Sequence, residues 1–354
     1  MEGSILDITD SWLRSDGPQV SVVVSCRARF ARNLAGLPFP PRANKLALRR
    51  VAETITAAIQ ASGRLRRFHC LTIDGFSEND RQHLRESQVI SQEMERGGEY
   101  RLVFLGTDPI TTLMVNEEDH LRAFVILPGL QIQVALDYLI ELDDELNRRL
   151  EFAFSEQIGF LTACPTNTGT ALRLSAMLHL PGLVLTKQIE PVMESIPTHG
   201  MAVRGYYGEN SAHLGNFYQI SNETTLGMTE QQIADRLSEL IRHTVERERD
   251  ARDELFSEKR TLMEDRIYRA VSMLASSRIM NTQEAIDHLS ILRLGIDRGF
   301  LPGLTHGALN QLIVRVQPGH LQREQGKMLD PERRDIARAS LLRNTFSDIA
   351  AHNN

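Results

Sequence analysis

The chain of 354 residues carries 46 acidic and 40 basic side chains, which gives a formal net charge of −6 at pH 7. This excess of acid disfavours constitutive binding to nucleic acid. Hydrophobic residues make up 42% and charged residues 24%, as expected for one large globular domain or two modest ones, and the sequence shows neither a signal peptide nor a membrane-spanning segment.

The three cysteines, Cys26, Cys70 and Cys164, are widely spaced, and none belongs to a CxxC pair. Their number and spacing argue against a disulfide framework and against a structural zinc site. We therefore expect a cytoplasmic protein.

The first 135 residues are predicted to form short strands around one longer helix. Residues 1–20 form a helical lead-in that ends at Asp16-Gly17-Pro18, and residues 21–25 are β-branched and strand-like. Prolines interrupt the chain at 38–41, and apolar residues at helical spacing predict a helix over 44–61. Further strand-like runs stand at 68–73, 100–105, 110–116, 123–127 and 131–134.

Short strands that alternate with helices of various lengths favour an α+β fold with an antiparallel sheet over a doubly wound parallel sheet. The pattern changes near residue 229, where Thr229-Glu230-Gln231-Gln232 fits a capping box. Almost everything beyond has helical spacing, with a further helix start at Asn281. After the lead-in, we therefore expect an α+β domain over residues 21–250 and a helical domain over 251–354.

Five arginines stand in four short polar blocks, at residues 25–29, 116–122, 164–173 and 204–209. Arginine keeps its charge, and its planar guanidinium suits phosphate oxygens, so convergent arginines can hold a triphosphate. The sequence has neither a GxxxxGK[ST] nor a GxGxxG motif. Side chains would therefore have to hold the phosphates of a nucleotide.

Taken separately, each block also has a simpler interpretation. Arg27 and Arg29 alternate at the end of a strand and share a face, but such a pair is often only surface charge. The acids at 117–119 follow an apolar run, which is typical of a site at a strand end and equally of an acidic turn. A single cysteine such as Cys164 is more often a small hydrophobe than a nucleophile.

The joint order of the blocks resembles the catalytic domain of the phosphagen (guanidino) kinases, and the whole chain resembles the bacterial protein arginine kinases. The resemblance covers essentially residues 20–354. It rests on Val24–Asn33, Val115–Arg122, Cys164–Arg173, and Val203–Glu209 with the downstream Gln219–Asn222.

The resemblance implies a catalytic carboxylate at Glu118, with Glu209 as its partner on the substrate guanidinium and Cys164 beside that group. It also implies that the ATP phosphates are held by Arg27, Arg29, Arg122, Arg173 and Arg204. The full ATP site that it implies comprises Ser25, Cys26, Arg27, Ala28, Arg29, Gln88, Arg122, Arg173, Leu174, Ser175, Ala176, Met177, Arg204, Gly205, Tyr206, Tyr207, Gly208 and Glu209.

The sequence differs from the family pattern at one position, residue 88. It differs from the small-molecule kinases in the length of chain before the first arginine pair. The family often has a histidine in a Glu-Lys-His-Leu-Ile-Ser stretch, where this chain has Gln88. Glutamine can still hydrogen-bond or stack, so we expect a changed ATP affinity rather than a loss of activity. Small-molecule guanidino kinases carry a helical domain before the first arginine pair, whereas here Arg27 comes early, which fits an open site for an arginine within a protein.

Near the C-terminus, residues 334–339 match the Arg-Asp-x-x-Arg-Ala element with which the protein arginine kinases bind phosphoarginine. On a helix, Arg334 and Arg338 share a face. The pattern by itself favours a salt-bridged surface helix. With the resemblance, it predicts an allosteric pocket in which Arg334 and Arg338 bind the phosphate and Asp335 binds the guanidinium.

The expected activity is phosphorylation of protein arginines with ATP and Mg²⁺, the metal ion being carried by ATP rather than by a site of the chain. In the family this mark directs proteins to a Clp-type protease and inactivates a heat-shock repressor. The expected partners are arginine-bearing proteins, an activator or adaptor, a Clp-type protease and further copies of the chain in a homodimer or larger oligomer, but neither nucleic acid nor a membrane.

Two alternatives remain. One is a kinase for free arginine or a related metabolite, against which the missing N-terminal domain argues. The other is a catalytically inactive adaptor that reads phosphoarginine, against which the intact Glu118 and Glu209 argue.

Overall fold

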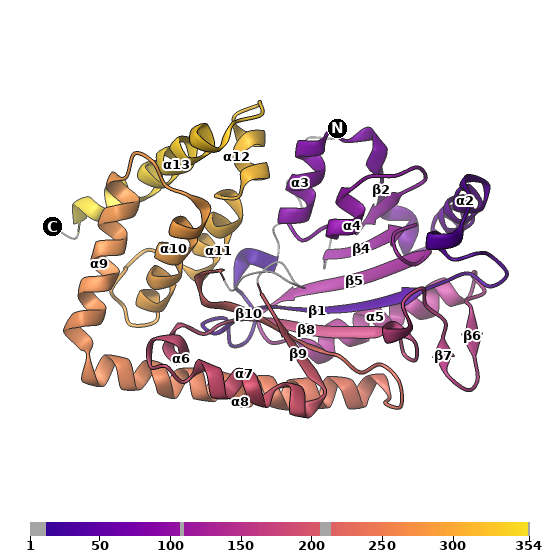
Figure 1. Cartoon of the computed structure of the whole chain (residues 1–354), viewed down its shortest axis with the longest axis horizontal. Coiled ribbons are helices and arrows are strands. Elements are labelled where there is room, and N and C mark those ends of the chain that lie inside the picture. Colours follow the sequence, from indigo (N-terminus) through magenta and orange to yellow (C-terminus); the bar gives the residue numbers. More distant parts are fainter. Residues whose placement is uncertain (1–11, 107–109, 206–213, 353–354) are drawn as a thin grey trace.

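The computed structural model describes residues 12–106, 110–205 and 214–352 (Figure 1). Within these residues, the largest sheet has eight strands in the order β2-β3-β4-β5-β1-β8-β10-β9. All of its neighbouring strands pair antiparallel, which confirms the predicted α+β class. In chain order the strands are β1 (Val23–Arg32), β2 (His69–Thr72), β3 (Leu102–Leu105), β4 (Ile110–Val115), β5 (Leu121–Pro128), β8 (Leu172–His179), β9 (Met201–Arg204) and β10 (Phe217–Asn222).

One face of the sheet, which we call the apolar face, carries the main core. Alternate residues of β1, such as Ala28 and Phe30, point into it and are buried. This face packs against helices α2 (Lys45–Ala61), α5 (Ile132–Asn147) and α8 (Glu230–Glu258).

The opposite face, which we call the polar face, lies between two groups of helices (Figure 1). At one side, α3 (Glu78–Glu86) and α4 (Gln92–Glu95) pack over β2 to β5. At the other side, C-terminal helices share a core with Val24, Ile126 and Phe217 of the sheet. The helices after α8 are α9 (Arg260–Ser276), α10 (Thr282–Ile296), α11 (His306–Arg315), α12 (Pro318–Glu324) and α13 (Pro331–His352).

Shorter elements complete the described chain. A hairpin of two short strands, β6 (Phe154–Ser155) and β7 (Gly159–Phe160), lies apart from the main sheet. The short helices α6 (Pro181–Leu185) and α7 (Ile189–Ser195) lie between β8 and β9 in the chain. Single 3-10 turns occur at Pro40–Arg42, Leu65–Arg67, Ile73–Gly75, Pro165–Asn167, Pro197–His199 and Leu214–Asn216.

Helix starts were the most predictable part of the fold. Helix α2 begins after Asn44, whose side chain accepts a hydrogen bond from the Ala47 N–H at 2.9 Å. The capping box at Thr229 is present, with reciprocal bonds of 3.2 and 2.9 Å to Gln232. Asn281 caps α10 as expected. Local side-chain chemistry is therefore sufficient to place these helix starts.

Two expectations about strands need correction. Strand β1 continues to Arg32, so Arg27 and Arg29 lie in its middle rather than at its end. The run 131–134 is not a strand, because it forms the first turn of α5. Its apolar spacing continues through Leu136 and Leu139, which are buried against the sheet, and this longer pattern has helical period.

Residues 1–11 of the expected helical lead-in lie outside the described residues. The part of the lead-in that is described contains a short 3-10 turn at Trp12–Arg14. The expected boundary at residue 250 falls inside α8, which continues to Glu258. Among the described helices, none is both long and apolar enough to span a membrane.

Candidate active site

The polar face carries the predicted arginines on neighbouring strands. Alternation along β1 points Arg27 and Arg29 to this face. The strand register places Arg29 directly opposite Arg173 of β8, and Arg122 of β5 opposite Ala31. Arg204 ends β9 at the far edge of the sheet, opposite Gln219. The sheet therefore brings four arginines from β1, β5 and β8 together, with Arg204 two strands away.

The arginines repel one another. Burial, together with the charge of Arg122, lowers the pKa of Arg27 to about 10 although Glu117 opposes this shift. Burial also lowers the pKa of Arg29 well below its ordinary value, and the positive charges of Arg122, Arg173 and Arg27 lower it further. Such a cluster is electrostatically favourable only when an anion neutralises it.

The two arginines of β1 have little to hold them otherwise. The Arg27 guanidinium lies over the Phe124 ring at 3.7 Å, and its Nε has no hydrogen-bond partner among the described residues. Arg29 likewise has neither a hydrogen-bond nor an ion-pair partner within the described parts of the chain. Donors buried in this way are suited to bind phosphate oxygens.

A tight acidic turn joins β4 to β5 beside these arginines. Asn116 opens it with a φ of +58°, and its side chain donates to the carbonyls of Leu48 and Tyr100 at 2.9 Å. Glu117 accepts a hydrogen bond from the Ser91 hydroxyl and forms an ion pair with Arg122 at 2.9 Å. Burial alone would raise the pKa of Glu117, but Arg122, Ser91 and Arg29 hold it below its ordinary value.

Glu118 is the acid of this turn that a substrate can reach. Its side chain is 37% exposed, whereas those of Glu117 and Asp119 are 1% and 0% exposed. Glu118 forms an ion pair with Arg122. It therefore stands at the end of the arginine cluster as an accessible carboxylate.

Asp119 connects this turn to the loop that carries Cys164. Its Oδ1 accepts hydrogen bonds from Asn33 Nδ2 and from the Ala163 N–H, both at 2.8 Å. Cys164 is partly exposed, and its Sγ lies 3.0 Å from the Thr166 hydroxyl. The sequence predicts no role for Asp119, which stands inside the block 116–122, or for Asn33, which lies just beyond the block 25–29, because their partners include backbone groups of a distant loop.

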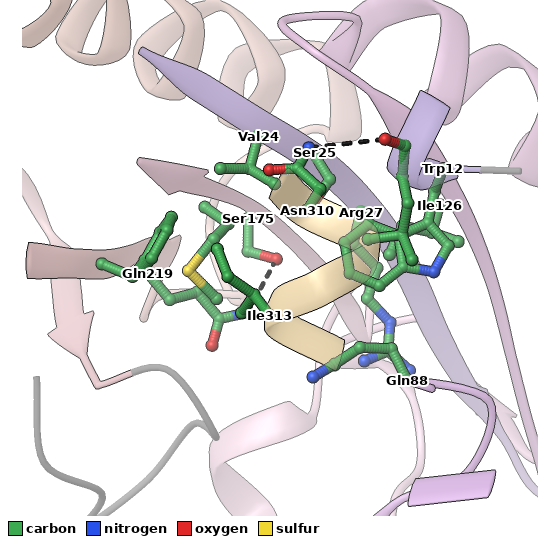
Figure 2. Close-up of a pocket in the computed structure, with 13 residues that line it drawn as sticks. Trp12, Val24, Ser25, Arg27, Gln88, Ile126, Ser175, Gln219, Asn310 and Ile313 are labelled. Carbon is green, nitrogen blue, oxygen red and sulfur yellow. Dashed lines mark hydrogen bonds between the residues drawn. The ribbon is translucent and has the colours of Figure 1, made fainter. Parts of the chain in front are cut away.

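A pocket lies at the beginning of β1, next to Arg27 (Figure 2). Five residues expected to bind ATP line it, namely Ser25, Arg27, Gln88, Ser175 and Met177. Gln88 has a φ of +62° directly after α3, a conformation that glutamine rarely adopts. The other lining residues are Trp12, Leu13, Val24, Ile126, Phe217, Gln219, Asn310 and Ile313.

The structure does not bring every expected ATP-binding side chain to this face. Four of them are buried in the apolar core, namely Cys26, Ala28, Leu174 and Ala176. Strand alternation explains the difference, since a continuous stretch of strand cannot present all of its side chains to one ligand. Burial also raises the pKa of the Cys26 thiol to about 12.

The backbone of Arg173–Met177 belongs to an interior strand. It pairs with β1 on one side and β10 on the other, and the Leu174 N–H donates to Asn222 Oδ1 at 2.7 Å. The backbone groups are therefore engaged within the sheet, and a ligand here would contact side chains. Gly205 is buried directly after β9. Of the remaining expected residues, Tyr206, Tyr207, Gly208 and Glu209 lie outside the described residues.

The element 334–339 lies on α13, in the C-terminal helices. Arg338 is buried, and it donates to the carbonyls of Val316 and Met280 at 2.8 Å and to Asp335 at 2.5 Å. Arg334 is half-buried. The three expected residues are thus neighbours, but Arg338 and Asp335 already bind each other and fasten α13 to the helices around it.

Comparisons with known proteins agree with this geometry. Residues 50–251 match the family described as ATP:guanido phosphotransferase, C-terminal catalytic domain, and residues 260–354 match the protein-arginine kinase McsB C-terminal domain. The protein-arginine kinase of Pelotomaculum thermopropionicum is 40% identical over 96% of both chains. That of Moorella thermoacetica is 42% identical over 96% of this chain and 97% of its own.

Solved structures show the same catalytic fold. The duplicated taurocyamine kinase from Schistosoma mansoni, with bound transition-state analogue components, superposes with a TM-score of 0.56 and 29% identity over 64% of this chain. This chain spans about a third of that structure's length, since the match covers 33% of it. A lombricine kinase has a TM-score of 0.58 at 23% identity, covering 69% of this chain and 70% of that one, and shows the fold alone.

The sheet, its arginine-lined face and the matched catalytic domain define a guanido phosphotransferase that uses ATP. Both matched domains and the full-length relatives then specify the group within that class. The chain belongs to the protein-arginine kinase family.

Proposed function

We propose that this kinase transfers the γ-phosphoryl group of MgATP to the guanidinium of arginine residues in proteins. The observation that carries the proposal is the cluster of mutually repelling arginines, which ends at the accessible carboxylate of Glu118. An anion belongs on the arginines and a cation belongs on the carboxylate. ATP and arginine have these charges.

The arginines would bind and neutralise the phosphates. Arg27, Arg29 and Arg173 lie side by side on β1 and β8, and Arg122 lies between this group and Glu118. Charge spreads over the oxygens of the transferring group, and guanidinium donors held in advance stabilise it without reorganisation. Arg204, at the edge of the sheet, would contribute from the opposite side.

Glu118 would orient the acceptor and take its proton. A guanidinium with a pKa of about 13.8 is not nucleophilic, so it must lose a proton as its nitrogen attacks the γ-phosphorus. In this step the N–P bond forms, the bond from phosphorus to the ADP oxygen breaks, and the proton moves to Glu118. General base catalysis of this kind is typically worth ~10²–10⁴ in rate.

Cys164 would lie against another edge of the same guanidinium. The Asp119 hydrogen bonds to Asn33 and Ala163 hold the Cys164 loop against the Glu118 turn. Glu209, the second expected carboxylate, would complete the acceptor site. This arrangement would place the reacting nitrogen in line with the phosphates, and positioning is the main contribution of proteins to phosphoryl transfer.

Mg²⁺ would reach the site bound to the ATP phosphates. In the described parts of the chain, no group of three or more His, Cys, Asp or Glu side chains is placed to hold a metal ion. Buried Glu117 and Asp119 are already engaged by arginine and backbone donors, and the oxygen ligands that Mg²⁺ prefers are those of the phosphates. When bound, the ion neutralises charge on the β- and γ-phosphates.

The acceptor is proposed to be arginine within a protein rather than a free guanidino compound. The relatives that match the whole chain carry the name protein-arginine kinase, and the C-terminal helices match the domain of that family. The catalytic fold is shared with a taurocyamine kinase, so phosphorylation of a small guanidino compound is the second candidate.

The wider setting is part of the same proposal. The protein would act in the cytoplasm, mark proteins for a Clp-type protease and contribute to stress control, with an activator or adaptor and as a homodimer or larger assembly. Arg334 with Asp335 and Arg338 would bind phosphoarginine at a regulatory site. Because Arg338 is held by two carbonyls, Arg334 would be the main phosphate ligand there.

A comparison of acceptors tests the proposed function. The protein is incubated with MgATP and either an unrelated arginine-rich protein or free arginine, and ADP release is followed. We expect clearly faster release with the protein acceptor, and phosphoarginine in that acceptor by mass spectrometry under mild, non-acidic conditions. Equal rates with free arginine would favour the metabolite kinase, and a lack of ADP release with either acceptor would contradict both.

A further inference from the structure

Next to Glu118, two pairs of residues from distant parts of the chain are joined by three hydrogen bonds. Asn33 and Leu34 follow directly after β1. Asp119 and His120 follow Glu118 in the turn before β5. Asn33 Nδ2 donates to Asp119 Oδ1 at 2.8 Å, and the His120 N–H donates to Asn33 Oδ1 at 2.9 Å. The Leu34 N–H donates to His120 Nδ1 at 3.0 Å, so the end of β1 and this turn form one unit.

The same asparagine also binds the segment that leads to Cys164. Its Nδ2 donates to the Leu161 carbonyl at 3.1 Å, so both amide hydrogens and the amide oxygen of Asn33 are in use. Its own carbonyl accepts from the Ala153 N–H at 2.7 Å. Ala153 and Leu161 flank the β6–β7 hairpin. One residue therefore holds both ends of the hairpin from which the chain continues to Cys164.

Asn33 acts through these partners and not on a ligand, because its side chain is only 1% exposed. Asp119 and His120 are buried as well. An unmade hydrogen bond at a buried polar group is costly, so the amide keeps its three partners in one arrangement. The relative position of Glu118 and Cys164 thus depends on a side chain that no ligand reaches.

We propose that Asn33 is a positioning residue for phosphoryl transfer, which sets the Glu118 carboxylate and the Cys164 loop in register with each other. The inference rests on the proposed function, because it takes these two groups to hold the acceptor guanidinium. It adds a residue outside the substrate site on which the alignment of the acceptor depends.

The nucleotide half of the site relies on other contacts. The arginines of β1 and β8 lie on strands that pair with each other. Arg122 lies 3.5 Å from Asp119, but it also forms an ion pair with Glu117 at 2.9 Å, which Asn33 does not touch. Loss of the Asn33 amide should therefore displace the acceptor and leave the binding of ATP intact.

Steady-state kinetics of the full chain test this difference. Asn33→Ala removes all three amide bonds, and kcat for a protein acceptor should fall by up to about 10²-fold, as when a reacting group is displaced by about 1 Å. The KM for MgATP and the dissociation constant of ADP should change by less than about twofold. A KM for MgATP that rises as far as kcat falls would overturn the inference.

Gln317→Ala is the matched control. Gln317 is also a buried amide, at 2% exposure, and it donates to the Ile313 carbonyl at 3.0 Å within the C-terminal helices. This variant should lose stability but keep kcat within about twofold of the wild type. If Asn33→Ala has the same kcat as Gln317→Ala, Asn33 is only structural and the inference is overturned.

Asn33→Asp separates hydrogen-bond donation from the shape of the side chain. Aspartate keeps an oxygen that can accept from His120, but when ionised it cannot donate to Asp119 or to the Leu161 carbonyl. We expect kcat to fall at least as far as in Asn33→Ala. Wild-type kcat in Asn33→Asp would show that the two donated bonds have no role in the reaction, and would overturn the inference.

Hydrogen exchange gives a readout that does not depend on activity. The Ala163 N–H donates to Asp119, and the His120 N–H donates to Asn33. In Asn33→Ala these two amides should exchange faster, while the amides of β1 and β8 keep their protection. Equally faster exchange throughout the sheet would show a general loss of stability rather than a displaced acceptor site, and would contradict the proposal.

The two proposals fail in different ways. If the wild type phosphorylates protein arginine but Asn33→Ala behaves like Gln317→Ala, only the role of Asn33 is wrong. If the wild type itself leaves protein arginine unmodified in the presence of MgATP, the proposed function is wrong, and the positioning role falls with it.

Discussion

Two groups of buried arginines in this molecule have opposite surroundings. On the polar face of the sheet, Arg27 and Arg29 lie among other positive charges. Burial and the repulsion by these charges lower the pKa of both arginines. In the helices, Arg252 and Arg338 are 3% and 1% exposed and are more fully buried than the two arginines of β1, but they are surrounded by acceptors. The first group suits an anion, in line with the proposed function, and the second holds the chain together.

The bonds of Arg252 illustrate the second group. Its Nε donates to Glu248 at 2.6 Å, and its two terminal nitrogens reach Asp297 at 2.7 Å and the His179 carbonyl at 3.0 Å. These partners come from three separate parts of the fold. Glu248 in turn accepts from the N–H groups of Gly182 and Leu183, at 2.8 and 2.9 Å. Such a network fastens α8 and α10 to the end of β8.

The comparison teaches that burial of arginine alone does not indicate function. What distinguishes the site is that like charges are gathered around Arg27 and Arg29. Folding must overcome this repulsion, and binding of the phosphates would relieve it. The following substitutions test the difference between the two groups.

The largest effect is expected for Glu118, the accessible acid beside Arg122. Glu118→Gln keeps the shape of the side chain but cannot take the guanidinium proton, so the rate of arginine phosphorylation should fall by ~10²–10⁴. The free energy of unfolding should change little, because the side chain is 37% exposed. The rate of phosphoarginine formation is measured by mass spectrometry. Turnover within a few-fold of the wild type would contradict the role of Glu118 as the base.

Loss of a structural arginine should instead destabilise the fold. Arg252→Met leaves Glu248 buried without its cation, which should lower the free energy of unfolding by about 3–5 kcal/mol. Arg247→Met, at an exposed position of the same helix, serves as the control and should change it by less than about 0.5 kcal/mol. Urea denaturation measures the free energy of unfolding of both variants. Similar losses in Arg252→Met and Arg247→Met would show that Arg252 does not hold the fold together.

Glu86 is a buried acid held at close range by neutral donors, with the Arg85 guanidinium 3.8 Å away, and it should give a pH-dependent signal. It accepts from the Gly319 N–H at 2.9 Å and the His320 N–H at 3.2 Å, and burial raises its pKa from 4.5 to about 7. Between these values the folded state keeps a proton that the unfolded state has lost. This group therefore lowers the free energy of unfolding as pH rises from about 4.5 to about 7, by at most about 3 kcal/mol.

Glu86→Gln removes this dependence. The stability of the variant relative to the wild type should increase across that pH range and level off above about 7. His320 packs beside the site, but burial lowers its pKa to about 3, so it stays neutral throughout this range. Denaturation at several pH values is the measurement, and a constant difference between the two proteins would show that Glu86 is ionised with its ordinary pKa.

The smallest effect concerns the proposed phosphoarginine pocket. Arg334→Ala with Asp335→Ala should weaken phosphoarginine binding by ~1.5–3 kcal/mol per lost contact and leave ATP binding intact. The exposed neighbours Glu332 and Arg333, both changed to Ala, form the control. Calorimetry with free phosphoarginine is the readout. An unchanged affinity in the Arg334 and Asp335 variant would make this part of α13 purely structural.

Local sequence was sufficient for much of the fold and for the centre of the site. Alternation in a strand is set by geometry, so the shared face of Arg27 and Arg29 could be predicted before β1 was known in full. The acid triplet after β4 was likewise visible as a polar break after an apolar run. The same alternation excludes the side chains of Cys26 and Ala28 from that face, which a continuous motif does not reveal.

Long-range packing explains what the sequence could not show. Helical spacing placed Arg334 and Arg338 on one face, but the carbonyls that bury Arg338 come from residues 280 and 316. Trp12 and Ile313 meet across 301 positions of the chain, and no local pattern links them. Strand propensity at 131–134 lost to the longer helical pattern of α5, which the sheet buries.

The central claim is that Arg27 and Arg29, which lie among like charges on the sheet, are held for the phosphates of ATP. The free energy of unfolding of Arg29→Met, measured with and without MgATP beside the wild type, tests it most directly. We predict that the variant is at least as stable as the wild type without nucleotide, because a repelled buried charge is removed, and that it loses most of the stabilisation by MgATP. A variant that is less stable without nucleotide but fully stabilised by MgATP would contradict the account.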